Sequence, residues 1–171
     1  MLLPESWLAL ALMPAQWPGY AAFAFGMACF LQTDDRRFIV FMALECAAYA
    51  LHFAMLGEGT AVASTLISLA RSLAALKART PAVGLGFIAL NLLAGAWLFD
   101  GLRSLLPIAA SVVGTAALFF LKGVPMRLLM LLGTAMWLVN NLLVGSVGGS
   151  LLEACLLGAN VTTIWRLWRR S

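Results

Sequence analysis

Charged side chains are scarce in this chain. Asp, Glu, Lys and Arg together make up only 11% of its 171 residues, whereas a soluble domain typically carries about 25%. Hydrophobic residues make up 63%, far more than a soluble core of this size requires. The composition therefore argues against a soluble fold and predicts an all-α protein that crosses the lipid bilayer several times.

Residues that could form a disulfide, a metal site or a catalytic set are also few. The three cysteines stand in separate apolar runs without paired spacing, so buried, unlinked thiols are expected. There is one histidine, and no Ser/His/Asp set, Cys/His set or phosphate-binding loop is recognisable in the sequence. The sequence therefore predicts no metal, no cofactor and no enzymatic activity.

A basic patch is missing as well, although the net charge is +4. The basic residues stand singly between apolar runs, unlike a surface that binds a phosphate backbone. We therefore expect no nucleic acid among the partners. Basic residues placed in this way are instead typical of the signals that orient membrane helices.

Seven apolar stretches make up most of the chain. Each has roughly 15–19 residues, at the short end of what crosses a hydrocarbon core of ~30 Å. The connections are only a few residues long, so neighbouring helices are predicted to be antiparallel. The stretches are 17–31, 38–56, 60–76, 82–99, 105–121, 128–144 and 151–168.

The basic residues predict how these helices are oriented. If the N-terminus lies outside, nine of the eleven Lys and Arg residues fall in inner connections and the inner tail. Arg103 falls in an outer connection, and Arg71 lies within the third helix. This strong positive-inside distribution predicts an outer N-terminus and a cytoplasmic C-terminus.

An internal repeat connects the two halves of the chain. The stretch Tyr49–Thr60 matches Trp137–Gly148 at an offset of 88 residues, with Gly57 opposite Gly145. Proline and basic landmarks upstream recur at offsets of 89 or 90. We interpret this as a duplication of a three-helix unit, the alternative being chance similarity among helices rich in Leu, Ala and Val.

The repeat predicts four parts of the chain. Residues 1–15 form an N-terminal extension, which lacks the basic start of a signal peptide and is expected to hold a short interfacial helix. Residues 16–80 form the first three-helix unit, 81–101 the connecting helix, and 102–171 the second unit with its basic tail. The connector gives both units the same orientation, and parallel repeats of this kind are a transporter architecture.

Six short motifs stand at intervals along the chain, each occurring once. They are TDDRRF (33–38), LLPI (105–108), FFLKGVPMR (119–127), NNLLVGSVGG (140–149), LLEA (151–154) and RLWR (166–169). In order and spacing they resemble the YgjV-like family of bacterial inner membrane proteins, over nearly the whole chain. The resemblance implies a place in the bacterial inner membrane and a fold, but no activity.

The plan of three, one and three helices is also similar to that of the SWEET sugar facilitators and the PnuC-type vitamin transporters. In SWEET-type proteins a Trp of the sixth helix and an Asn of the last helix line the pocket. This implies substrate-binding roles for Trp137 and Asn160, and by the repeat for Tyr49 and Ser68 (or Ser72). An indole with amides suits a neutral, polar, ring-shaped solute.

Four predicted helices, two in each unit, carry polar side chains at helical spacing. Such groups are costly in lipid and usually face the protein interior. A cavity on the axis between the units is where these polar stripes would converge. The alternative is interhelical hydrogen bonding, which stabilises by only ~0.6 kcal/mol per bond on average.

An inner gate and an outer vestibule complete the predicted site. Glu45 and Arg71 lie at similar depths, roughly 10 Å and 8 Å from the inner helix ends. We predict that they form an ion pair closing the inner side, the alternative being that Arg71 reaches the inner headgroups. The predicted outer vestibule is formed by His52, Asn140, Asn141 and Glu153.

The function stays open among three classes. The leading hypothesis is a facilitator or secondary transporter that passes a small polar solute through a central pocket. The alternative is a non-transporting membrane scaffold or partner subunit, and a homo-oligomer is compatible with either. A third option is an intramembrane enzyme built on Glu153 and His52. His52 itself is either a proton-coupling group or a hydrogen-bonded packing residue.

Overall fold

The fold is helical throughout the part of the chain that the computed structural model describes, residues 7–30 and 35–169. The all-α prediction is thereby confirmed for these residues, which contain no strand. The elements are α1 (Trp7–Ala11), α2 (Gln16–Phe30), α3 (Asp35–Met55), α4 (Gly59–Lys77), α5 (Pro81–Trp97), the 3₁₀-helix η1 (Leu102–Ser104), α6 (Leu105–Phe120), α7 (Gly123–Leu143) and α8 (Val147–Trp168).

Several helices begin before the apolar stretch that predicts them. The apolar pattern of the sixth stretch begins at residue 128, but α7 begins at Gly123; α8 likewise begins at Val147 rather than at 151. A helix can extend beyond the apolar run, because its hydrogen bonds join its own backbone N–H and C=O groups and do not depend on apolar side chains. Pro125 is tolerated in the first turn of α7, where its missing N–H would have no helical partner.

Within the described residues, three segments are long and apolar enough to cross a membrane, namely Gly59–Lys77, Leu102–Phe120 and Gly123–Leu143. Three further apolar segments are shorter, namely Val40–Met55, Pro81–Trp97 and Val147–Thr162. Their lengths and composition fit a multi-pass membrane protein. The plan of seven spans stays a prediction.

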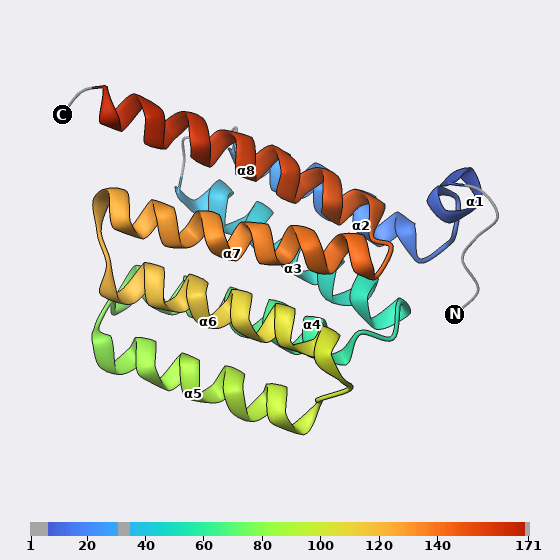
Figure 1. Ribbon diagram of the computed structural model, residues 1–171, viewed down its shortest axis with the longest axis horizontal. Coiled ribbons are helices and arrows are strands. Elements are labelled where there is room, and N and C mark those ends of the chain that lie inside the picture. The colour runs from blue at the N-terminus through green and yellow to red at the C-terminus, as the bar shows by residue number, and fades with distance from the viewer. Residues whose placement is uncertain (1–6, 31–34, 170–171) are drawn as a thin grey trace.

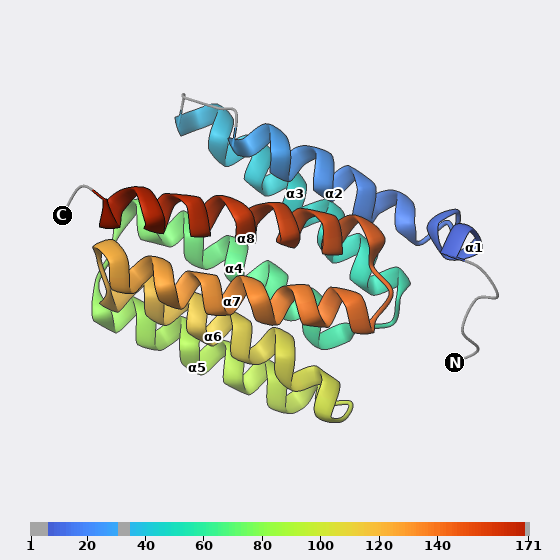
Figure 2. The same cartoon turned by 45° about the horizontal axis from the view of Figure 1, so that its top comes forward.

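Six helices form a closed ring. Successive helices run antiparallel (Figure 1, Figure 2). Contacts join α2 to α3, α3 to α4, α4 to α6, α6 to α7, α7 to α8, and α8 back to α2. Helix α5 lies outside this ring, against α4 and α6. In the order of these contacts, α2, α3 and α4 are followed by α6, α7 and α8.

The turns after α3 and α7 have the same backbone structure. Gly57 and Gly145 adopt φ values of 80° and 73°, in the left-handed region that favours glycine. Glu58 N–H donates to the Phe53 carbonyl, and Ser146 N–H donates to the Asn141 carbonyl. Both turns are Schellman caps, which satisfy the last carbonyls of a helix. The 88-residue match in sequence is thus also a match in hydrogen bonding.

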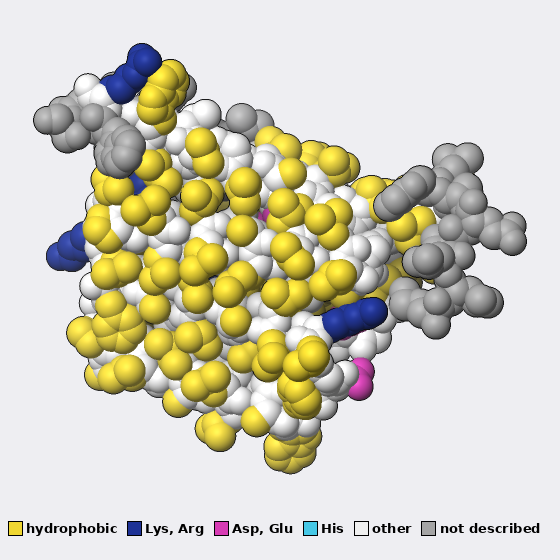
Figure 3. Space-filling view, in the orientation of Figure 1, with side chains coloured by type: hydrophobic (Ala, Val, Ile, Leu, Met, Phe, Trp, Pro, Cys, Tyr) yellow, Lys and Arg dark blue, Asp and Glu magenta, His cyan; other side chains and the backbone are white. Residues whose placement is uncertain are grey.

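The sides of the bundle are apolar. Figure 3 shows hydrophobic side chains spread over the face in view, with most of the charged side chains near its two ends. Leu93 and Trp97 of α5 are among the exposed apolar residues, at 70% and 89%. Such a surface is stable in contact with lipid.

Asn91, a residue that the sequence analysis did not select, holds α5 to the ring. Its Nδ2 donates to the Ile108 carbonyl at 2.9 Å, and its Oδ1 accepts from Ser64 Oγ at 3.1 Å. Asn91→Leu should lower the free energy of unfolding by about 1–3 kcal/mol, because the Ser64 hydroxyl and the Ile108 carbonyl each lose a buried hydrogen bond. Thermal unfolding in detergent measures this. Leu92→Ala, an exposed neighbour, is the control, and equal losses in both variants would contradict the role of Asn91.

Candidate functional site

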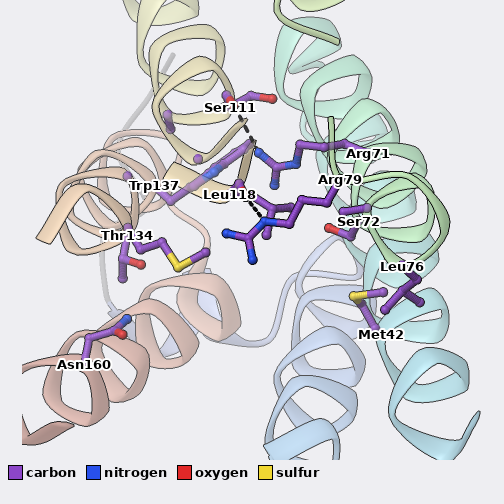
Figure 4. Close-up of a pocket in the computed structure, with 15 residues that line it drawn as sticks. Met42, Arg71, Ser72, Leu76, Arg79, Ser111, Leu118, Thr134, Trp137 and Asn160 are labelled. Carbon is purple, nitrogen blue, oxygen red and sulfur yellow. Dashed lines mark hydrogen bonds between the residues drawn. The ribbon is translucent and has the colours of Figure 1, made fainter. Parts of the chain in front are cut away.

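A cavity of about 520 Å³ opens inside the ring. It is bordered by α3, α4, α6, α7 and α8, and by the connection between α4 and α5. Figure 4 shows Arg71 and Arg79 reaching into it from the α4 side, with Trp137 and Thr134 opposite. Its polar lining consists of Arg71, Ser72, Arg79, Ser111, Thr134 and Asn160. We call it the larger cavity.

A smaller cavity of about 130 Å³ adjoins the larger one. The two share Arg71 and Trp137 in their linings. The remaining polar residues of the smaller cavity are Glu45, Cys46, Tyr49, Thr65, Ser68 and Glu153. Arg71 and Trp137 therefore stand between a compartment whose described lining has two carboxyl groups and one whose described lining has none.

Residues related by the 88-residue offset line the same cavities. Met42 and Met130 both border the larger cavity, as do Ser72 and Asn160. The smaller cavity is bordered by two further pairs, Tyr49 with Trp137 and Thr65 with Glu153. The cavities thus lie where equivalent positions of the two halves of the chain face each other.

An aromatic stack crosses the ring between the two halves. Tyr49 stacks on Phe53 at 5.2 Å between ring centroids, and Phe53 stacks on Trp137 at 5.9 Å. Helices α3 and α7 lie opposite each other in the ring, so the stack spans its interior. The Tyr49 hydroxyl is buried near the Asn141 side chain without making a hydrogen bond to it.

Arg71 binds α6 rather than Glu45. Its Nη1 donates to the Ser111 carbonyl and to Thr115 Oγ1, both at 3.1 Å. Gly114 makes room for this, since a Cβ there would lie 2.9 Å from Nη1. Although Glu45 and Arg71 both line the smaller cavity, no ion pair joins these two described residues. The structure therefore does not contain the predicted ion pair, because the guanidinium instead donates to the Ser111 carbonyl and the Thr115 hydroxyl on α6.

His52 belongs to a closed hydrogen-bond network rather than to an open vestibule. Its Nδ1 lies 2.5 Å from the Ala15 carbonyl, which only accepts, so Nδ1 carries the proton. Nε2 then accepts from Ser146 Oγ at 2.7 Å, and the same oxygen accepts from Gly149 N–H. The network satisfies a neutral imidazole, which favours the packing role over proton coupling.

Gln16 makes two further hydrogen bonds to the turn between α7 and α8, which closes this end of the ring. Its Nε2 donates to the Gly145 carbonyl, and its Oε1 accepts from Val147 N–H at 3.0 Å. We call Ala15, Gln16, His52 and Ser146 the outer latch, after the side on which the basic residues predict it to lie. Gln16 was not among the predicted site residues, because a single amide at the start of a helix has no distinctive spacing; in the structure Leu10 and Gln16 lie against the α7–α8 turn. Residues 1–6 lie outside the described residues.

The predicted vestibule residues are therefore buried. His52, Asn140, Asn141 and Glu153 are all between 0% and 8% exposed. Glu153 faces the smaller cavity, and neighbouring Asn141 and Gly149 lie so close that a Cβ on Gly149 would be 2.6 Å from Asn141 Oδ1. The prediction of an open outer ring is wrong, because the outer latch covers this end of the ring.

The predicted substrate residues divide between the cavities. Trp137 and Asn160 line the larger cavity, while Tyr49, Ser68 and again Trp137 line the smaller one. Ser68 Oγ lies 3.2 Å from Ser111 Oγ, a further link between α4 and α6. Whether these residues bind a solute stays a prediction. Among residues 7–30 and 35–169, no three His, Cys, Asp or Glu side chains are placed to hold a metal ion.

Comparison with known proteins identifies the family. Residues 13–171 match Imp-YgjV, described as a bacterial inner membrane protein. Inner membrane protein YgjV of Escherichia coli K12 is 35% identical over 160 residues, which cover 92% of this chain and 87% of that protein. No solved structure matches the chain significantly, so the similarity to SWEET and PnuC-type transporters stays a prediction. The chain belongs to the YgjV family of bacterial inner membrane proteins.

Proposed function

We propose that the protein passes a small polar solute across the inner membrane, as a facilitator or secondary transporter. The solute would cross between two parallel three-helix units, α2–α4 and α6–α8, with α5 as connector. The observation that carries this proposal is the pairing of cavity residues across the repeat, such as Ser72 with Asn160 and Tyr49 with Trp137. Transporters built from repeats bind their solutes at the repeat interface.

The asymmetry of the ring supports one-sided access to the cavity. The larger cavity extends toward the end where α4 meets α5 and α6 meets α7, with Arg79 and Leu118 in its lining. The opposite end is closed by the outer latch. On the orientation that the basic residues predict, the cavity faces the cytoplasm. Opening the latch while closing the inner end would give alternating access.

A solute screen tests this function. The purified protein is heated in detergent with sugars, nucleosides and vitamins, and a transported solute should raise its Tm by mass action. Trp137→Ala and Asn160→Ala should abolish that rise, because both side chains line the larger cavity. Leu93→Ala, on the outer face of α5, is the matched control. A rise that survives both cavity substitutions would place the binding site elsewhere.

The same screen separates the alternatives. If no solute shifts Tm, the polar stripes serve packing, and the protein is a scaffold or partner subunit. An enzyme built on Glu153 and His52 has little support, because both ring nitrogens of His52 are engaged by Ala15 and Ser146.

A further inference from the structure

The larger cavity carries positive charge in its described lining. Arg71 and Arg79 line it, and its described lining contains no Asp or Glu. Glu45 and Glu153 lie in the smaller cavity, beyond Arg71 and Trp137. A cleft lined by one sign of charge concentrates ligands of the opposite sign. This favours an anionic solute over the neutral one that the sequence alone predicts.

Arg71 has one edge of its guanidinium free. Nη1 is occupied by Ser111 and Thr115. Nε is buried without a partner, and the hydrogen bonds from Arg71 to residues that the structure describes both leave from Nη1. Nε and Nη2 form the planar fork that binds a carboxylate through two parallel hydrogen bonds. A buried donor without a partner is costly, so a carboxylate on this edge would remove that cost.

Arg79 is less available for direct contact. Its Nε donates to the Leu118 carbonyl, and its Nη2 donates to the Leu121 carbonyl at 2.9 Å. These bonds fasten the α4–α5 connection to the end of α6. Arg79 therefore contributes positive potential at the mouth of the cavity, while Arg71 offers the free donors inside it.

The remaining lining suits a flat organic group. Trp137 supplies the aromatic surface of the larger cavity, and Thr134 and Asn160 supply uncharged polar groups. Figure 4 shows Trp137 and Thr134 across the cavity from Arg71, with Asn160 further along the same wall. A planar ring between these walls would keep its carboxylate near Arg71.

We propose that the solute is a small organic acid with a planar ring, whose carboxylate binds the Nε–Nη2 edge of Arg71 and whose ring lies against Trp137. This inference rests on the proposed function, because it names the class of solute for the same cavity. It makes Arg71 the residue that distinguishes a carboxylate from the isosteric amide.

Three ring compounds and one bare anion test the proposal. Purified full-length protein in detergent is titrated with benzoate, benzamide, benzylamine and inorganic phosphate at constant ionic strength, and Kd is obtained from the rise in Tm. Benzoate should bind at least about tenfold more tightly than benzamide, because it adds charge-assisted hydrogen bonds. Benzylamine and phosphate should bind no better than benzamide.

Variants then assign the preference to Arg71. Arg71→Gln should equalise the Kd values of benzoate and benzamide, and Arg71→Lys should restore part of the difference as a point charge without the fork. Arg103→Gln, at the other end of the bundle, should leave the preference intact. Arg71 also ties α4 to α6, so replacing it weakens the packing as well. The preference for benzoate over benzamide is therefore measured first in the wild-type protein, where the folding of the variants has no effect.

Each of the following results would overturn the inference. Equal binding of benzamide, or tighter binding of phosphate, would exclude a ring carboxylate while leaving the transport function standing. Binding of sugars or nucleosides alone, lost in Trp137→Ala, would do the same. A protein that no solute of any charge stabilises would overturn both the inference and the proposed function.

Discussion

Gly148→Ala should destabilise the protein more than any other single-methyl addition to α8. A Cβ at this position would collide with the Gly19 carbonyl and lie 2.8 Å from the Tyr20 backbone nitrogen. Backbone atoms cannot rotate away as a side chain can, so α2 and α8 would have to separate. Overpacking of a core costs about 1–3 kcal/mol, and a clash with rigid backbone should lie at or above the upper end of that range. Thermal unfolding in detergent and the yield of folded protein measure the effect.

Gly158→Ala is the matched control for this substitution. It lies on the same helix, and a Cβ there would meet nothing within 4 Å. Alanine also favours a helix over glycine by roughly 0.5–1 kcal/mol, so this variant should be as stable as the wild type or slightly more stable. If both substitutions gave the same Tm, α2 and α8 could not approach as closely as the structure has them.

Gln16→Ala should open the outer latch and lower stability at the same time. The substitution leaves the Gly145 carbonyl and the Val147 N–H without their partner, at a cost of about 1–3 kcal/mol for each buried group. The α7–α8 turn then loses the two hydrogen bonds that join it to the Gln16 side chain of α2. A cysteine placed at buried Val144, in a background without the native cysteines, should become reactive to a membrane-impermeant maleimide.

The latch prediction has an internal test and a control. His52→Ala should have the same effect as Gln16→Ala, and the double variant should lose less than the sum, because both side chains hold the same turn. Leu12→Ala, an exposed residue beside the latch, should leave Val144→Cys unreactive. Labelling of that cysteine in the wild-type background would show that the outer end is already open.

The helices and the two glycine turns could be predicted from sequence because they rest on local patterns. Each apolar stretch found a long helix of the described chain to within a few residues, and Gly57 and Gly145 marked turns that require a positive φ. The polar stripes likewise named residues that line the two cavities. Such features follow from the side chains themselves and their spacing along one helix.

The contacts that could not be predicted involve backbone carbonyls, which every residue type carries and which no sequence pattern therefore identifies. Ala15 binds His52 through a backbone carbonyl, and Ser111 binds Arg71 in the same way, so a search for complementary side chains finds neither. Depth along a helix placed Glu45 beside Arg71 but said nothing about α6, which offers Arg71 nearer acceptors. The Ser111, Gly114 and Thr115 spacing on α6 was the one available signal, a glycine between two hydroxyl residues on one helix face.

The closed ring has a consequence for how the protein is made. Helix α8 contacts both α7 and α2, so the last helix of the ring to be synthesised packs against the first helix of the ring. Until α8 inserts, the Gly19 carbonyl of α2 lacks the close packing of Gly148, and the α7–α8 turn that Gln16 and His52 hold does not yet exist. The ring therefore closes only after α8 has been synthesised, and a chain that stops before α8 leaves the ring open between α7 and α2.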